Sequence, residues 1–244
     1  MPDQPKPLEK MHTAIQLAAF HYIACLKATP SNADYTVTIG NLEFRFDNIR
    51  TAETRILHWE FQRWAASAVL RDLIEYFSIF LTEIYGDAVA NASDRTFATT
   101  PSQFERKGIE DQLSILAREF SIAPEWVTRL TGHNRARNCL AHRAGVVGLP
   151  DATHGPDLVI SWLAVKTTLA EGVPAPFLDV GGAMSGLVRA QRSHEESTAT
   201  VELLHREKRV GVGSVLHFLP DEVLEICQTL QLASAAIGGI VSAS

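Results

Sequence analysis

The strongest constraint on the fold is a long stretch, residues 51–85, that contains neither proline nor glycine. Apolar side chains recur along it at the three- and four-residue spacing of one helix face: Leu70, Leu73, Phe77, Phe80 and Ile84. We therefore expect a helix of about nine turns. The apolar stripe continues back through Trp59, Phe61 and Trp64, which we expect to lie in the core. A helix of this length is typical of the central element of a bundle.

The sequence predicts further helices before and after this element. Periodic apolar residues predict helices from Leu8 to about Lys27 and over residues 109–120. Pro124 opens another helix, which Gly145 is well placed to end. Pro220 starts a last helix with an apolar stripe of Val223, Ile226, Leu230, Ala233 and Ile237. We expect a loop over residues 86–100.

Alternating patterns predict a small amount of β-structure. Tyr35–Phe46 alternates around Gly40–Asn41, as in a tight hairpin. Leu158–Leu169 predicts one strand, and Val201–His205 with Val210–Phe218 predicts a second pair around a charged turn. The expected fold class is mainly α, a helical bundle with small β-hairpin additions.

We expect one packed body rather than two independent domains, because the last helix is apolar on one face and must bury it. Residues 1–50 form an N-terminal helix and hairpin packed on the bundle. Residues 51–244 form the helical domain, with a β-containing insertion at about 150–218.

The composition limits the function. The chain has 244 residues, 46% apolar and 20% charged, which excludes wholesale disorder. A net charge of −6 disfavours a broad basic face that coats nucleic acid, but it permits a local basic pocket. Three widely spaced cysteines disfavour a disulfide framework, and the N-terminus is no signal peptide. The uncharged run 226–244 is too polar for a good membrane span, so we expect a cytoplasmic protein.

One window of this acidic chain is purely basic. Residues 126–150 contain no Asp or Glu, but they hold several basic side chains: Arg129, His133, Arg135, Arg137, His142 and Arg143. An internal carboxylate would occupy an arginine and exclude a phosphate. On a helix, Asn138 and His142 lie on one face, so Asn138 could orient the imidazole. Arg137 lies about 7.5 Å from His142 along the axis, within reach of a long side chain.

Other kinds of site fit the sequence less well. Gly211–Gly213 lacks the context of a dinucleotide-binding turn, and the P-loop, HExxH and GxSxG motifs are absent. A metal site of His133, Cys139 and His142 would have arginines around it that repel a cation. A Cys139–His142 nucleophile pair is disfavoured because Cys139 fits better as a small core residue. The plainest alternative is a solvated basic face with a histidine near the helix C-terminus.

The residues Arg137–His142, RNCLAH, followed by Gly145–Val147, resemble the signature of the HEPN superfamily (higher eukaryotes and prokaryotes nucleotide-binding). That signature is an arginine, a polar residue that is often asparagine, and then a histidine on one of the last helices of a small bundle. The resemblance covers roughly residues 51–240 as a pattern and residues 137–147 as a motif. It implies a HEPN-like bundle.

The resemblance also implies a function. Many HEPN proteins are metal-independent endoribonucleases, and many are toxins or defence effectors that dimerise across a shared cleft. His142 would then act as general acid or base, Arg137 would bind the scissile phosphate, and Asn138 would orient His142 or contact RNA. Weaker candidates for substrate contact are Arg135, Arg143 and His133. No cofactor or metal is expected, and the partners would be RNA, a second copy of the chain, and an antitoxin or regulatory protein.

Two further classes stay open from the sequence. Some HEPN proteins are non-catalytic dimeric modules that bind RNA, a nucleotide or a protein partner. The third class is a structural bundle in which the motif is a coincidence. Arg71 and Glu75, four apart on the long helix, could pair with each other and are candidates to support the site.

Overall fold

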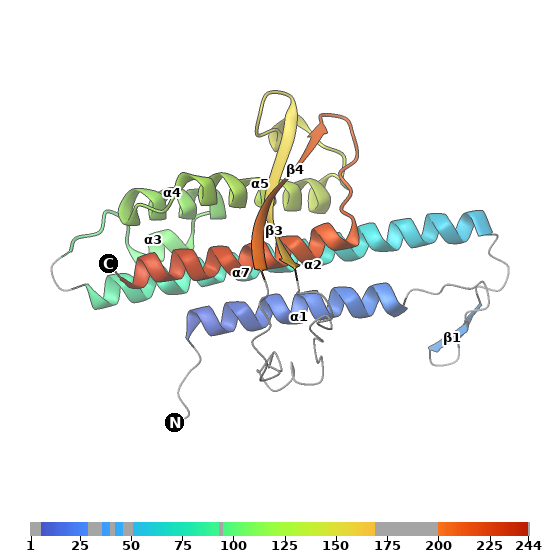
Figure 1. The fold of residues 1–244 in the computed structure, drawn as a ribbon, viewed down its shortest axis with the longest axis horizontal. Helices are drawn as coiled ribbons and strands as arrows, with labels where there is room; N and C mark the ends of the chain where they lie inside the picture. The colour runs from blue at the N-terminus through green and yellow to red at the C-terminus, as the bar shows by residue number, and fades with distance from the viewer. Residues whose placement is uncertain are drawn as a thin grey trace.

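The computed structural model describes residues 6–28, 36–39, 42–45, 51–92, 95–168 and 200–243. These residues are mainly helical (Figure 1). The helices are α1 (Pro7–Ala28), α2 (Thr51–Asn91), α3 (Pro101–Glu105), α4 (Ile109–Phe120), α5 (Pro124–His142) and α7 (Pro220–Ser242). The strands are β1 (Thr36–Ile39), β2 (Leu42–Arg45), β3 (Asp157–Thr168) and β4 (Thr200–Gly211). They form two separate antiparallel pairs, which confirms a mainly helical fold with small β-additions.

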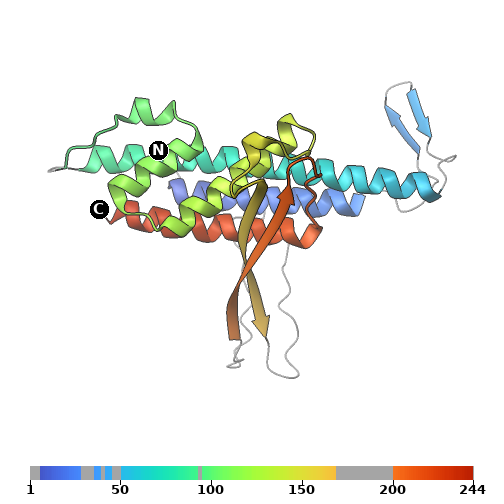
Figure 2. The ribbon, with the colours of Figure 1, turned by 90° about the horizontal axis from the view of Figure 1, so that it is seen from above.

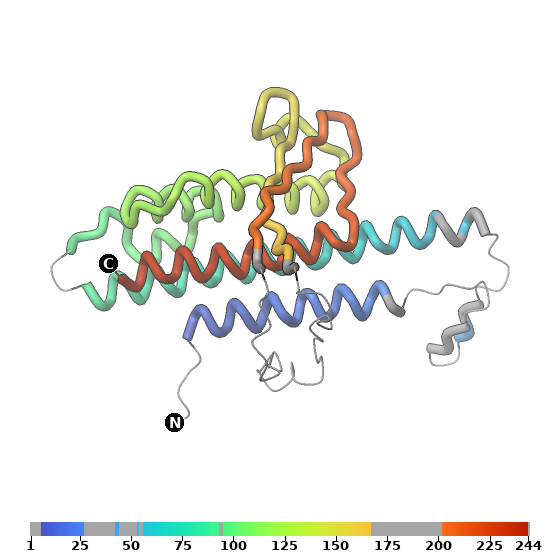
Figure 3. The backbone as a smooth tube through the Cα atoms, in the orientation of Figure 1, coloured from blue at the N-terminus to red at the C-terminus, as the bar shows by residue number. Residues whose placement is uncertain are grey.

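Helix α2 is the central element of the bundle, as its length predicts. Helices α1, α5 and α7 all pack along it, and α4 packs on α5 (Figures 1, 2 and 3). The predicted apolar stripe of α2 is buried throughout: Leu70, Leu73, Phe77, Phe80 and Ile84. The predicted stripe of α7 is buried as well. The core therefore lies between these two helices and the neighbours that cover them.

The N-terminal turns of α2 differ from the prediction. Trp64 is 61% exposed and Trp59 is also exposed, so the aromatic stripe does not continue into the core. In Figure 2, the first turns of α2 extend past the ends of α1 and α7, which leaves these side chains little to pack against. Trp59 instead stacks on His217, with ring centroids 5.6 Å apart.

The end of α2 also differs from the prediction. The helix continues through Gly86 to Asn91 where a loop was expected from residue 86. Glycine costs a helix about 1 kcal/mol, and the partial burial of Ala88 and Val89 against the core offsets that cost. The short helix α3 was not predicted, although Thr100 and Gln103 form a capping box that marks its start.

Strands β3 and β4, each twelve residues long, form a two-stranded ribbon that projects from the bundle (Figure 2). The charged residues 206–209 lie inside β4, which continues through Val210 to Gly211, so the predicted turn there is wrong. Beyond Gly211, Val215 forms an isolated bridge with Val146. A two-stranded ribbon leaves many side chains in solvent, so a charged run fits it. Strand β3 packs on α5 and α7, and the Thr229 hydroxyl accepts a hydrogen bond from the Leu163 N–H at 2.9 Å.

The first hairpin is confirmed by the pairing of β1 with β2, from Thr36 opposite Arg45 to Ile39 opposite Leu42. Its expected turn, Gly40–Asn41, lies outside the described residues, as does most of the Gly/Pro-rich loop at 170–200. Within the described ranges, α7 is the one helix whose length and composition would suit a membrane span. Half of its apolar window is buried inside the structure, so these apolar side chains pack against the rest of the bundle.

Candidate functional site

The basic window lies mostly on α5, and the end of this helix is tightly defined. The N–H groups of Arg143 and Gly145 both donate to the Cys139 carbonyl, at 3.0 and 3.1 Å. Ala144 and Gly145 have φ of +50° and +82°, the left-handed conformation that ends a helix. Arg63 on α2 donates to the Ala144 carbonyl at 2.7 Å. The predicted stop at Gly145 is confirmed, and His142 is the last helical residue.

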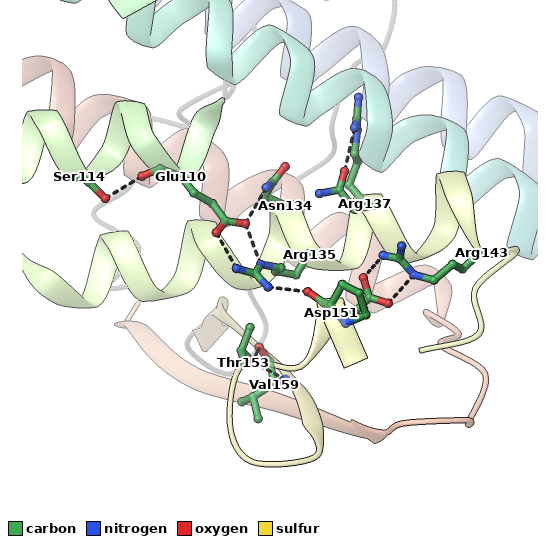
Figure 4. A network of polar contacts seen from close by, with 11 residues as sticks. Glu110, Ser114, Asn134, Arg135, Arg137, Arg143, Asp151, Thr153 and Val159 are labelled. Atoms are coloured by element: carbon green, nitrogen blue, oxygen red, sulfur yellow. Dashed lines mark hydrogen bonds and ion pairs between the residues drawn. The ribbon is translucent and has the colours of Figure 1, made fainter. Parts of the chain in front are cut away.

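Arg135 is held by a carboxylate from another helix (Figure 4). Its Nε and Nη2 donate to the two carboxylate oxygens of Glu110 on α4, both at 2.8 Å. Asn134 also donates to Glu110 at 2.9 Å, and Arg135 bonds the Pro150 carbonyl. Hydrogen bonds from Arg135 lower the pKa of Glu110 below its usual value. The guanidinium group of Arg135 is therefore already hydrogen-bonded to groups of the protein itself.

Arg143 is held in the same way. Its Nε donates to Asp151 at 2.6 Å, and its Nη2 contacts the other carboxylate oxygen (Figure 4). Asp151 is fully buried and also accepts a hydrogen bond from the Gly148 N–H at 2.8 Å. Asp151 is the first residue after the acid-free window. The expectation that Arg135 and Arg143 contact a substrate is therefore corrected: both guanidinium groups neutralise internal carboxylates.

His133 also departs from its expected role in substrate contact. Its side chain is fully buried at the junction of α5 with β3. Burial and the nearby charge of Arg129 lower the pKa of His133 to about 4, so its imidazole is neutral at pH 7. A neutral imidazole with no exposed surface cannot contact RNA, so His133 is a core residue.

Arg137 has a different environment from Arg135 and Arg143. Its side chain points toward α2 (Figure 4), where its Nη2 lies 3.5 Å from the carboxylate of Glu75. Glu75 is 67% exposed, so this contact is weak. The Nη1 of Arg137 donates to the Asn138 side-chain oxygen at 2.9 Å. The expected bond from Asn138 to His142 is thus replaced by a bond between Arg137 and Asn138.

His142 is exposed at the end of α5. Within the part of the chain that the structure describes, no hydrogen bond or ion pair engages its imidazole. Cys139 is buried, which raises the pKa of its thiol to about 11. A Cys139–His142 nucleophile pair therefore does not fit. Over the described ranges, no group of three His, Cys, Asp or Glu side chains could hold a metal ion.

Several residues around the site could not be predicted from the sequence. Glu110 and Arg63 come from distant elements, and no local pattern links them to α5. The sequence predicts Glu75 both as a partner of Arg71 and as a candidate to support the site. The structure instead pairs Arg71 with its neighbour Asp72 at 3.1 Å, which leaves Glu75 to contact Arg137.

Comparisons with known proteins give no match for this chain, whether with family models, curated proteins or solved structures. The interpretation of Arg137, Asn138 and His142 therefore depends on the residues themselves and on their contacts. Those contacts distinguish Arg135 and Arg143, which carboxylates hold at two points, from Arg137, which meets only an exposed carboxylate, and from His142, which is exposed.

Proposed function

We propose that this protein is a metal-independent endoribonuclease of HEPN type that cleaves single-stranded RNA. One observation carries the proposal: Arg137 and His142 are the members of the predicted motif that remain available for a ligand. Arg135 and Arg143 are each held at two points by a carboxylate. Arg137 meets only the exposed Glu75, at 3.5 Å, among the described carboxylates.

The chemistry suits these two side chains. The 2′-hydroxyl of RNA attacks the adjacent phosphorus, and a base must take its proton. The bond to the 5′-oxygen breaks, and an acid must protonate that leaving group. Histidine serves either role near neutral pH, and arginine stabilises the charge that develops on the phosphate. Asn138 accepts a hydrogen bond from Arg137 and so steadies its guanidinium group.

We propose that the active form is a homodimer, because one His142 per chain supplies one of the two proton-transfer groups. The first turns of α2 beside the motif support this part of the proposal. They expose apolar side chains: Ile56, Leu57, Trp59 and Trp64. Trp64 also borders a cavity of about 220 Å³ against Leu140 and Ala144 at the end of α5. This exposed apolar surface is suited to contact with a second copy.

The test is cleavage of end-labelled single-stranded RNA in EDTA. We expect 2′,3′-cyclic phosphate and 5′-hydroxyl ends, and a loss of roughly 100-fold or more in His142→Ala and in Arg137→Ala. Matched controls are His154→Ala and Arg118→Ala, which remove an exposed histidine and an exposed arginine elsewhere. Equal activity in all four variants would assign the cleavage to a contaminant or another site.

A second candidate is a non-catalytic HEPN module that binds RNA or a protein partner. The contact between Glu75 and Arg137 favours it, since a nearby carboxylate weakens the attraction of Arg137 for phosphate. This candidate predicts RNA binding without cleavage from a folded dimer. In either role we propose a cytoplasmic protein, with an antitoxin or regulatory protein as a candidate partner.

A further inference from the structure

The first half of α5 carries a second cluster of side chains, built around Arg129 and away from Arg137 and His142. Trp126, Arg129 and His133 lie three and four residues apart, so they share one face of the helix. This face meets the β3–β4 ribbon, from which His205 extends. The Nη2 of Arg129 lies 3.4 Å from the Nδ1 of His205, and the guanidinium carbon lies 5.0 Å from the centroid of the Trp126 ring.

The charge of Arg129 is not neutralised by any contact within the described ranges. The residue is only 6% exposed, and its Nε is buried without a hydrogen-bond partner. The one carboxylate whose charge favours its protonated form is that of its neighbour Glu125. Arg135 on the same helix and Arg143 directly after it each have a two-point carboxylate partner. Burying a cation costs free energy unless an anion compensates its charge. Arg129 is buried in this way without a carboxylate in contact, whereas Arg135 and Arg143 each have one.

The groups around Arg129 do not supply that anion. Burial and Arg129 keep the pKa of His133 low, near 4, so this imidazole adds no charge of either sign at pH 7. Both ring nitrogens of His133 are buried, and the side chain interacts with the Ser161 backbone. Glu207, two residues along β4 from His205, accepts a hydrogen bond from Arg209 at 2.7 Å. His205 itself is exposed, and its Nδ1 lies 3.4 Å from Arg129, which keeps 6% of its surface open to solvent.

We propose that Arg129 and His205 form a binding site for a phosphate group carried by a small molecule, with Trp126 packing against the rest of that molecule. The planar fork of arginine matches phosphate oxygens, and a ring N–H of His205 donates to the same group. Trp126 is half-buried and offers an aromatic surface next to the charge. A nucleoside monophosphate combines a phosphate with a flat apolar base and is the ligand class that fits. The site does not depend on the proposed nuclease activity.

The test measures binding of inorganic phosphate and of adenosine monophosphate to the full chain by calorimetry, in chloride buffer at fixed ionic strength. We expect both to bind, the nucleotide more tightly because its base packs on Trp126. Arg129→Gln should weaken binding at least tenfold, and His205→Ala should weaken it about threefold or more. Arg118→Gln, which removes an exposed arginine on α4, should bind as the wild type does.

Two controls keep the result decisive. Where Arg129→Gln does not fold, His205→Ala carries the test, since this exposed side chain contributes little to the core. Arg129-dependent binding should persist in Arg137→Ala, which separates this site from the candidate active site. The proposal is overturned if the folded wild type binds neither probe beyond the effect of equal chloride, or if both site variants bind like the wild type.

Discussion

Arg143 and Arg137 lie six residues apart at the same end of α5, but their guanidinium groups meet different kinds of carboxylate. Arg143 is bound at two points by Asp151, which is fully buried. Arg137 lies 3.5 Å from Glu75, which is largely exposed. Arg135, bound at two points by the half-buried Glu110, belongs with Arg143. Of these three arginines, two are thus held at two points by carboxylates and one meets only an exposed carboxylate.

The difference shows that a window without acidic residues need not lack acidic partners in space. The carboxylates that meet α5 come from α2, from α4 and from the turn at Leu149–Asp151. What distinguishes a structural arginine from an available one is the burial and geometry of its partner. Substitutions of the carboxylates should therefore have graded effects on the free energy of unfolding, in the order of that burial.

Asp151→Asn should have the largest effect, a loss of about 3 kcal/mol in the free energy of unfolding. The amide is neutral and cannot accept from both donors of Arg143 as well as from the Gly148 N–H. Urea unfolding at pH 7 measures this loss. Asp87→Asn, an exposed site on α2, is the control and should change stability by less than about 0.5 kcal/mol. A loss below 1 kcal/mol for Asp151→Asn would contradict the structural role of Arg143.

Glu110→Gln should have an intermediate effect, about 1–2 kcal/mol at pH 7, because the charge-assisted bonds from Arg135 are replaced by weaker ones. The pKa of Glu110 is lowered in the folded protein. Its stabilisation is therefore present above the unfolded pKa of about 4.3 and is lost as the pH falls through the lower folded value. The stability difference between wild type and variant should shrink over that range.

Unfolding curves measured at intervals between pH 7 and pH 3 test this dependence. Glu105→Gln, an exposed carboxylate at the end of α3, is the matched control, and it should remain within about 0.5 kcal/mol of the wild type at pH 7. A difference for Glu110→Gln that stays constant with pH would show that the carboxylate charge is not what stabilises the contact.

Arg137→Ala should cost less, about 1 kcal/mol or below, and His142→Ala should stay within about 0.5 kcal/mol. The substitution Arg137→Ala removes a weak ion pair with Glu75 and the hydrogen bond to Asn138. His142 is exposed and engaged by no described side chain. Thermal unfolding of the variants used in the cleavage assay measures this directly. A large loss of stability in either variant would place it with Arg143 among the structural residues.

The sequence predicts the helices well because their apolar periodicity reflects burial on one face. The stripe from Leu70 to Ile84 is buried as expected. The same periodicity fails at Trp59 and Trp64, since it cannot tell where a helix extends past its neighbours. It also fails at residues 206–209, because a charged run in an isolated ribbon has the composition of a turn.

The candidate site could be predicted only in part. The motif singles out Arg137 and His142 from their types and spacing; in the structure His142 is exposed and Arg137 meets the exposed Glu75 and Asn138. The roles expected for Arg135 and Arg143 depended on the local absence of carboxylates. Glu110, 25 residues away from Arg135 in the chain, reverses that expectation through packing of α4 on α5. Contacts between elements distant in sequence leave no local pattern to detect.

Glu75→Gln should have the smallest effect on stability, within about 0.5 kcal/mol, because an exposed ion pair contributes little. Its effect on RNA binding should be larger than its effect on folding. If Arg137 binds phosphate as proposed, removing the negative charge 3.5 Å from it should tighten binding of single-stranded RNA about threefold at low salt. The gain should fade as salt screens the charges.

Filter binding or fluorescence anisotropy across a salt series measures this change, and Glu105→Gln is the control for the loss of one negative charge elsewhere. Weaker RNA binding in Glu75→Gln would mean that Glu75 holds Arg137 in the orientation that phosphate needs. Arg137 would then resemble Arg143 in depending on its carboxylate, and the contrast between the two arginines would be one of degree.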